Sequence, residues 1–180
     1  MKKYRIVLGA VFALFFLVAC DEDLLDVEES FSFSFKVEVD TDQAQFSETE
    51  VIDLAADVSL IKNYGNLIKE VTLDHVIVQI VDFDGNIDVT LTTGTLYVLT
   101  KDGLNPQLIT NLSGLNLEDL VDPTELDLNA AGVNLLGELA KTPPHSFKLK
   151  YDVEIDEEDV PVKFTAKFDF TATMVANPLN

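Results

Sequence analysis

Hydrophobic and polar residues alternate with a period of two over long stretches of this chain, which is typical of strands with one buried face. Residues 31–39, FSFSFKVEV, place three phenylalanines and two valines on one side. The stretches 147–155 and 162–172 repeat the pattern and predict two strands of one hairpin. The buried side of this hairpin should form one core layer. Its members are Phe164, Phe168 and Phe170 with some of Phe147, Leu149, Tyr151 and Val153.

The middle of the chain, residues 70–99, predicts a second hairpin with its turn at Asp84-Gly85. Apolar residues are nearly consecutive from Val76 to Val81, so we expect both faces of that strand to be covered. Thr93-Gly94 interrupts the second strand of this hairpin. Glycine within a strand pattern is typical of a bulge.

Two segments predict short helices. Residues 56–69 suit one or two helical turns with Asp57 as the N-cap. Residues 129–141 predict a helix that ends before two consecutive prolines, although two glycines weaken it. The stretch 122–125 leaves two interpretations open, because it has the residue order of a helix start and also begins a strand-like alternation.

Together these elements predict an all-β fold. We expect an antiparallel two-layer β-sandwich of about seven or eight strands, with one or two short helices in its crossovers. A domain of about 150 residues with this alternation buries enough apolar surface for one independent core.

The first nineteen residues have a different character from the rest. Lys2, Lys3 and Arg5 precede an apolar run that extends from Ile6 to Leu17. That run of about twelve residues is shorter than the roughly twenty that a membrane-spanning helix needs. A basic start followed by a short apolar run predicts a cleaved signal peptide.

The chain's only cysteine ends the tetrad Leu17-Val18-Ala19-Cys20, which resembles the lipobox of bacterial lipoproteins. The resemblance implies that signal peptidase II cuts before Cys20 and that the thiol carries a diacylglycerol. The alternative is an ordinary secretory signal with an incidental cysteine. We therefore divide the chain into a signal peptide, 1–19, a lipidated cysteine with an acidic tether, 20–30, and a single sandwich domain, 31–180.

Acidic residues follow the cysteine directly. The run Asp21-Glu22-Asp23 resembles the export tag with which some Gram-negative bacteria send lipoproteins to the outer face of the outer membrane. In other Gram-negative bacteria, an aspartate after the lipidated cysteine retains the lipoprotein in the inner membrane, so Asp21 alone allows both locations. The longer acidic run favours the outer membrane and the cell surface.

Net charge excludes one class of partner. The chain has 12 basic and 32 acidic residues, and three basic ones leave with the signal peptide, so the mature protein carries 9 minus 32, or −23, and no arginine. Such a surface repels phosphate backbones and lacks the guanidinium that grips them. We expect no nucleic acid partner. The expected partners are the membrane, through Cys20, and an unidentified protein or surface ligand.

Catalytic motifs are missing from the sequence. There is no G-x-S-x-G elbow, no H-E-x-x-H pair and no glycine-rich phosphate loop. His75 and His145 are the only imidazoles, and both lie at predicted strands. We therefore expect neither enzymatic activity nor a cofactor.

One group of polar residues has the spacing of a metal site. Asp82, Asp84, Asn86 and Asp88 alternate around a glycine, as oxygen ligands do in calcium loops. The position eleven residues after Asp82 is Thr93 instead of the bidentate glutamate of an EF-hand. A tight hairpin turn is the favoured interpretation, and a weak calcium site is the alternative.

Two functions remain compatible with the sequence. The first is a surface-exposed binding or interaction module, which would use the irregular segment 101–144 or the hairpin tips. The second is a structural component of an envelope assembly that faces the periplasm. Glycan binding is disfavoured, because the chain has no tryptophan for a stacking platform and its alternation assigns most other aromatics to the core.

Overall fold

The computed structural model describes residues 26–84 and 87–178. Its strands are β1 (Val27–Thr41), β2 (Gln45–Asp53), β3 (Ile68–Asp84), β4 (Leu91–Thr100), β5 (Gln107–Asn111), β6 (Thr124–Glu125), β7 (Ser146–Ile155) and β8 (Val162–Ala176). The α-helices are α2 (Leu54–Asp57), α3 (Ser59–Tyr64) and α4 (Ala130–Lys141), and the 3-10 turns are η2 (Gly65–Leu67), η3 (Glu118–Leu120) and η4 (Glu157–Asp159).

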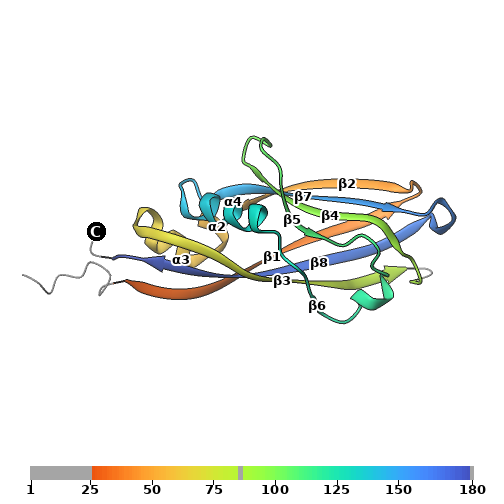
Figure 1. Ribbon diagram of the computed structural model, residues 1–180, viewed down its shortest axis with the longest axis horizontal. Coiled ribbons are helices and arrows are strands. Elements are labelled where there is room, and N and C mark those ends of the chain that lie inside the picture. The colour runs from red at the N-terminus through yellow and green to blue at the C-terminus, as the bar shows by residue number, and fades with distance from the viewer. Residues whose placement is uncertain (1–25, 85–86, 179–180) are drawn as a thin grey trace, which may run out of the picture.

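The strands form two antiparallel sheets that pack face to face (Figure 1). Sheet A has the order β1-β8-β3-β6 and sheet B the order β2-β7-β4-β5. This distribution of eight strands over two sheets is that of a jelly roll. The predicted all-β, two-layer antiparallel sandwich is therefore confirmed.

Both predicted hairpins are wrong. β7 and β8 lie in opposite sheets, and so do β3 and β4, so neither connection joins hydrogen-bonded neighbours. Alternation shows which face of a strand is buried, but it does not show which strand lies beside it. The shared core is nevertheless confirmed, because the apolar residues of β7 and β8 are buried against one another across the sandwich.

The prediction that both faces are covered from Val76 to Val81 holds only in part. Val76, Val78 and Ile80 are buried and Ile77 is half-buried, whereas Val81 is 40% exposed. The predicted bulge in β4 is confirmed by a register shift between Leu91 and Thr93. A Cβ on the adjacent Gly94 would lie 3.0 Å from Leu112 Cβ, so the close approach of that loop leaves little room for a side chain.

The predictions for the helical segments are confirmed in part. Asp57 does not cap the first helix; Asp53 does, because its side chain accepts a hydrogen bond of 3.2 Å from Ala56 N. The predicted helix at 129–141 is confirmed as α4, with Asn129 as its N-cap. The open question at 122–125 is resolved in favour of a strand, since Thr124–Glu125 forms β6 beside β3.

Helix α4 packs against β5 and β3 at the positions of its two glycines. A Cβ on Gly132 would collide with the backbone of Leu108 in β5, and one on Gly137 would collide with the carbonyl oxygen of Val71 in β3. The helix therefore sits directly on the backbone of one strand from each sheet. Because β6 pairs with only two residues of β3, α4 covers much of the remaining side of the sandwich.

The sandwich is long, and the strand register brings the first and last strands together at one end, which we call the terminal end. β3 has 17 residues, which corresponds to roughly 55 Å at about 3.3 Å per residue. Val27 pairs with Ala176, so the first and last strands enter and leave at the end that carries α2 and α3 (Figure 1). β1 begins at Val27, four residues before the expected start of the domain. Within the described residues, no helix has the length and apolar character needed to cross a membrane.

Candidate functional site

The predicted lipidation and export residues lie outside the described part of the chain. They are Leu17, Val18, Ala19 and Cys20 of the lipobox and Asp21, Glu22 and Asp23 of the acidic run.

The candidate calcium ligands are only partly described. Asp82 and Asp84 are exposed residues at the end of β3, and Asn86 lies outside the described residues. Asp88 accepts a hydrogen bond of 2.8 Å from Asn116 Nδ2. Across residues 26–84 and 87–178, no group of three or more His, Cys, Asp or Glu side chains is arranged to hold a metal ion.

The two histidines have separate surroundings. His75 is half-buried in β3 opposite Thr171. His145 is buried, and its Nδ1 donates to the carbonyl oxygen of Ala140 at 2.8 Å, while its own carbonyl accepts from Leu54 N at 3.0 Å. His145 thus ties the end of α4 to the start of α2, which is a structural role.

The outer face of sheet B carries a groove that the sequence did not predict. The register places side chains of β2, β7 and β4 in four rows across the sheet. From the distal end toward the terminal end, these rows are Gln45, Glu154 and Thr93; Ser47, Asp152 and Thr95; Thr49, Lys150 and Tyr97; and Val51, Lys148 and Leu99.

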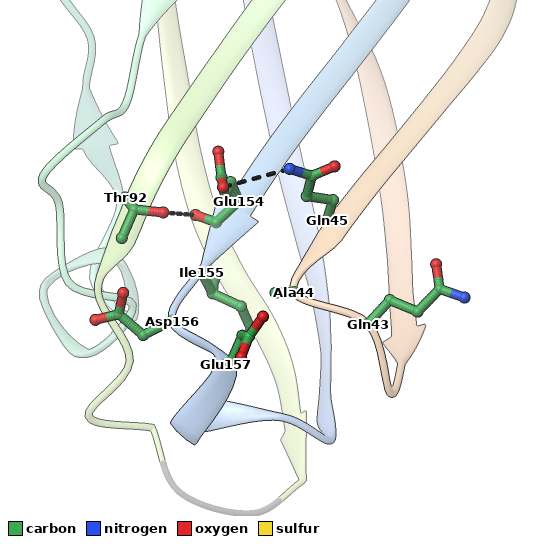
Figure 2. A pocket seen from close by; sticks show the side chains of 8 residues that line it. All are labelled: Gln43, Ala44, Gln45, Thr92, Glu154, Ile155, Asp156 and Glu157. Atoms are coloured by element: carbon green, nitrogen blue, oxygen red, sulfur yellow. Dashed lines mark hydrogen bonds between the residues drawn. The ribbon is translucent and has the colours of Figure 1, made fainter.

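Glu154 organises the distal end of the groove, a hollow of about 540 Å³ (Figure 2). Figure 2 shows Gln45 and Thr92 on either side of Glu154. Gln45 Nε2 donates to Glu154 Oε1 at 3.3 Å, and Thr92 Oγ1 donates to the Glu154 carbonyl at 2.8 Å. Asp156 and Glu157 also line this end, so it is acidic.

The middle of the groove is a hollow of about 470 Å³ that shares Gln45 and Glu154 with the distal end. Asp152 dominates it, accepting hydrogen bonds from Ser47 Oγ at 2.5 Å and from Lys150 Nζ at 2.7 Å. Amide, hydroxyl and carboxylate groups therefore face solvent side by side over this part of the sheet.

The terminal end of the groove is the largest of its three hollows, about 680 Å³, and shares Lys150 and Asp152 with the middle. Tyr97 and Leu99 lie on its floor, and the β4–β5 connection contributes Gly103 and Pro106. This connection stands up from the outer side of sheet B (Figure 1). Lys148 Nζ lies 3.4 Å from the position that a Cβ on Gly103 would occupy, so the loop backbone lies over this ammonium group.

Hydrogen bonds fix the shape of this loop. Gly103 N donates to the carbonyl of Thr100 at 2.8 Å, and Thr100 N donates to the carbonyl of Leu104 at 3.0 Å. Gly103 has φ +80°, which glycine adopts without strain. The loop is thus a tight turn over residues 101–103, and Leu104, which follows it opposite Thr100, is 67% exposed.

Charge reverses along the groove. Glu154 and Asp152 lie toward the distal end, and Lys150 and Lys148 follow on the same strand toward the terminal end. Lys150 pairs with Asp152, whereas Lys148 has no ion pair among the described residues. The groove therefore combines an apolar and cationic end with a hydroxyl-rich and anionic end.

Sequence reasoning contained a signal for this site. The alternation of residues 147–155 already placed Lys148, Lys150, Asp152 and Glu154 outward. The pattern around Tyr97 also turns its ring outward, because its neighbours Leu96 and Val98 are fully buried. The sequence pattern did not show that β2 and β4 lie on either side of β7.

Comparison with known proteins gives no family. No family model and no curated protein matches the chain. A structure of Desmodium yellow mottle tymovirus aligns with 86% of this chain and 91% of its own, at 12% identity and a TM-score of 0.33. The empty head of turnip yellow mosaic virus aligns with 82% and 81%, at 12% identity and a TM-score of 0.34.

A structure of infectious bursal disease virus, Gt strain, aligns with 89% of this chain but only 35% of its own, at 11% identity and a TM-score of 0.37. TM-scores this low do not establish a common fold, and nothing about function follows from these alignments. The jelly-roll topology stands on the strand order of the chain itself.

Proposed function

We propose that this protein is a lipid-anchored envelope lipoprotein whose sandwich is a non-catalytic binding module displayed at the cell surface. The groove on the outer face of sheet B is its ligand site. The observation that carries the proposal is the continuity of this groove over four rows of β2, β7 and β4, with a change of chemistry from one end to the other.

The chemistry of the groove suits recognition. An apolar floor with a few convergent polar groups is typical of ligand sites. Tyr97 and Leu99 supply such a floor, and Lys150 and Asp152 supply charged groups held in place by their mutual ion pair. Leu99 is only 7% exposed, so the half-buried Tyr97 supplies most of the apolar surface that a ligand could reach.

The anchor suits a display role. Only six residues lie between Cys20 and Val27, so a lipidated cysteine lies at most about 25 Å along the chain from the first strand. The sandwich then projects from the membrane along its length, with the groove on its flank. Two acyl chains or more are needed for stable anchoring, which a diacylglycerol supplies.

A ligand panel tests the binding role. The full chain, extracted from membranes in detergent, is melted by circular dichroism with neutral oligosaccharides, acidic oligosaccharides and peptides at millimolar concentration. A ligand of the native state raises the melting temperature. We expect at least one member to do so for the wild type and for Ser32→Trp on the outer face of sheet A, but not for Thr49→Trp, which fills the groove.

If no member of the panel raises the melting temperature of the wild type, the binding proposal is wrong and the structural envelope role replaces it. An equal rise in Thr49→Trp would place the ligand outside the groove and would contradict the proposed site.

A further inference from the structure

We propose that the groove binds an oligosaccharide that carries one carboxylate-bearing sugar, such as glucuronic acid, seated on Tyr97 between Lys148 and Lys150. The inference rests on the proposed binding function and names the ligand class of the same groove. Three features of the described residues support it: an outward aromatic ring, two lysines beside it, and a neutral-to-acidic continuation along the sheet.

Tyr97 provides an outward aromatic ring on which a sugar can stack, although the chain has no tryptophan. Absence of tryptophan disfavoured glycan binding, but Tyr97 lies on the outer side of sheet B, in one row with Thr49 and Lys150. Its half-buried ring lines the largest hollow of the groove. A tyrosine in this position offers an apolar ring face with a polar hydroxyl, which suits the apolar face and the hydroxyl edge of a sugar ring.

The lysines define the charge of the ligand. The mature protein has a formal charge of −23, so its surface as a whole repels anions. Lys148 nevertheless lies in the groove without an ion pair among the described residues, with the Gly103 backbone above it. Its ammonium has three donors that are free to rotate toward an anion. A carboxylate on the ligand is the group that complements this site.

The remaining rows limit the ligand to one acidic sugar. Asp152 and Glu154 occupy the next two rows of β7, and Asp156 and Glu157 follow at the distal end. A second or third carboxylate on the ligand would face these groups and be repelled. Hydroxyl groups of neutral sugars, in contrast, are good donors to carboxylates and good partners for the amide of Gln45.

This arrangement of charges disfavours other anionic polymers as ligands. A nucleic acid carries a phosphate at every residue, so part of it would lie over Asp152 and Glu154. A polyuronate meets the same repulsion. An oligosaccharide with a single acidic unit at the Lys148 end and neutral units toward Glu154 matches both ends of the groove.

Calorimetric titration of the full chain in detergent tests the ligand class. Three tetrasaccharides are compared: a neutral one, one with a single terminal glucuronic acid, and tetragalacturonic acid. We expect the singly acidic sugar to bind about tenfold more tightly than either of the others, as one charge-assisted contact provides. Lys148→Gln should abolish this preference. Lys36→Gln, an exposed lysine on sheet A, should retain it.

A second variant pair tests the ring. Tyr97→Ala should weaken binding of the neutral and the singly acidic sugar alike by about tenfold, and Tyr97→Phe should retain most of the affinity, because the ring face is kept. Circular dichroism melts of each variant show that the sandwich is intact.

The outcomes separate the two proposals. If neutral and singly acidic sugars bind the groove equally, or if only peptides of the earlier panel bind, the ligand class is wrong and the binding module stands. If tetragalacturonic acid binds most tightly, the restriction to one acidic sugar is wrong. If nothing in either set binds, both proposals fail.

Discussion

Tyr151 on β7 meets Phe168 on β8 edge to face across the core, with ring centroids 5.4 Å apart and ring planes inclined at 63°. The two residues belong to different sheets, so this contact joins the layers of the sandwich. Phe33 of β1 makes a similar contact with Phe147 of β7 at 6.0 Å. Aromatic side chains from both sheets therefore bind the two layers together.

Removing one of these rings should destabilise the fold strongly. Phe168 is fully buried, so Phe168→Ala should lower the free energy of unfolding by roughly 3 to 5 kcal/mol. The neighbouring Lys167→Ala removes only a partly exposed ion pair with Asp169 and should cost less than about 1 kcal/mol. Urea unfolding measures both, and equal midpoint shifts would contradict the assigned faces of β8.

Gly137 should reverse the usual effect of a glycine in a helix. Alanine normally stabilises a helix interior by about 1 kcal/mol relative to glycine. In α4, however, a Cβ at this position collides with the Val71 carbonyl oxygen, so Gly137→Ala should destabilise by roughly 1 to 3 kcal/mol. Asn134→Ala, on the exposed side of the same helix, should instead stabilise slightly. Thermal melts compare the two, and stabilisation by Gly137→Ala would refute the close contact with β3.

Alkaline pH should expose the burial of Tyr151. Desolvation raises the pKa of this phenol above that of an exposed tyrosine. Above about pH 10 the unfolded phenol loses its proton while the folded one keeps it, so stability is full below pH 10 and falls as pH rises, by up to about 1.4 kcal/mol per pH unit. Tyr151→Phe lacks this contribution. Urea unfolding between pH 9 and pH 11 measures how the free energy of unfolding changes with pH, and this change should be smaller for the variant than for the wild type. Equal changes would mean that Tyr151 ionises freely in the folded state.

The sequence predicted the buried face of a strand better than it predicted which strands lie beside it in the sheet. Alternation identified the buried sides of β1, β7 and β8, because each has one face in the core along most of its length. The sheet partner of each strand depends on how the loops cross between layers, and no local pattern records this. Both hairpin predictions failed for that reason.

β2 was missed because carboxylates interrupt its apolar side. Phe46, Glu48, Glu50 and Ile52 occupy alternate positions, so the pattern does not read as a strand. Burial, together with the charges of Glu50 and Glu38, raises the pKa of Glu48. Charged residues at alternate positions of an edge strand discourage pairing with another chain, which is a reason for a strand to carry them. Without β2, the groove on sheet B could not be assembled from the sequence.

Calcium should have little effect on stability. Asp82 and Asp84 are exposed, and Asp88 is engaged by Asn116. We therefore expect millimolar calcium to leave the melting temperature within about 1 °C of its value in chelator, because only a ligand of the native state raises it. A rise of several degrees that disappears in Asp84→Ala would establish the calcium site instead.

Display of the groove on an anchored protein is tested most directly by labelling intact cells with a membrane-impermeant maleimide. Thr49→Cys places a thiol on the exposed face of β2 within the groove. Lipidation should block Cys20, so the wild type should stay unlabelled even after denaturation. Thr49→Cys should be labelled on intact cells, and replacing Asp21, Glu22 and Asp23 with alanine should restrict labelling to lysed cells.

Two results would contradict the account. Labelling of the denatured wild type would show a free thiol at Cys20 and remove the lipid anchor. Labelling of Thr49→Cys only after lysis would place the groove inside the envelope and favour the periplasmic structural role. The account predicts full labelling of Thr49→Cys on intact cells with none of the wild type.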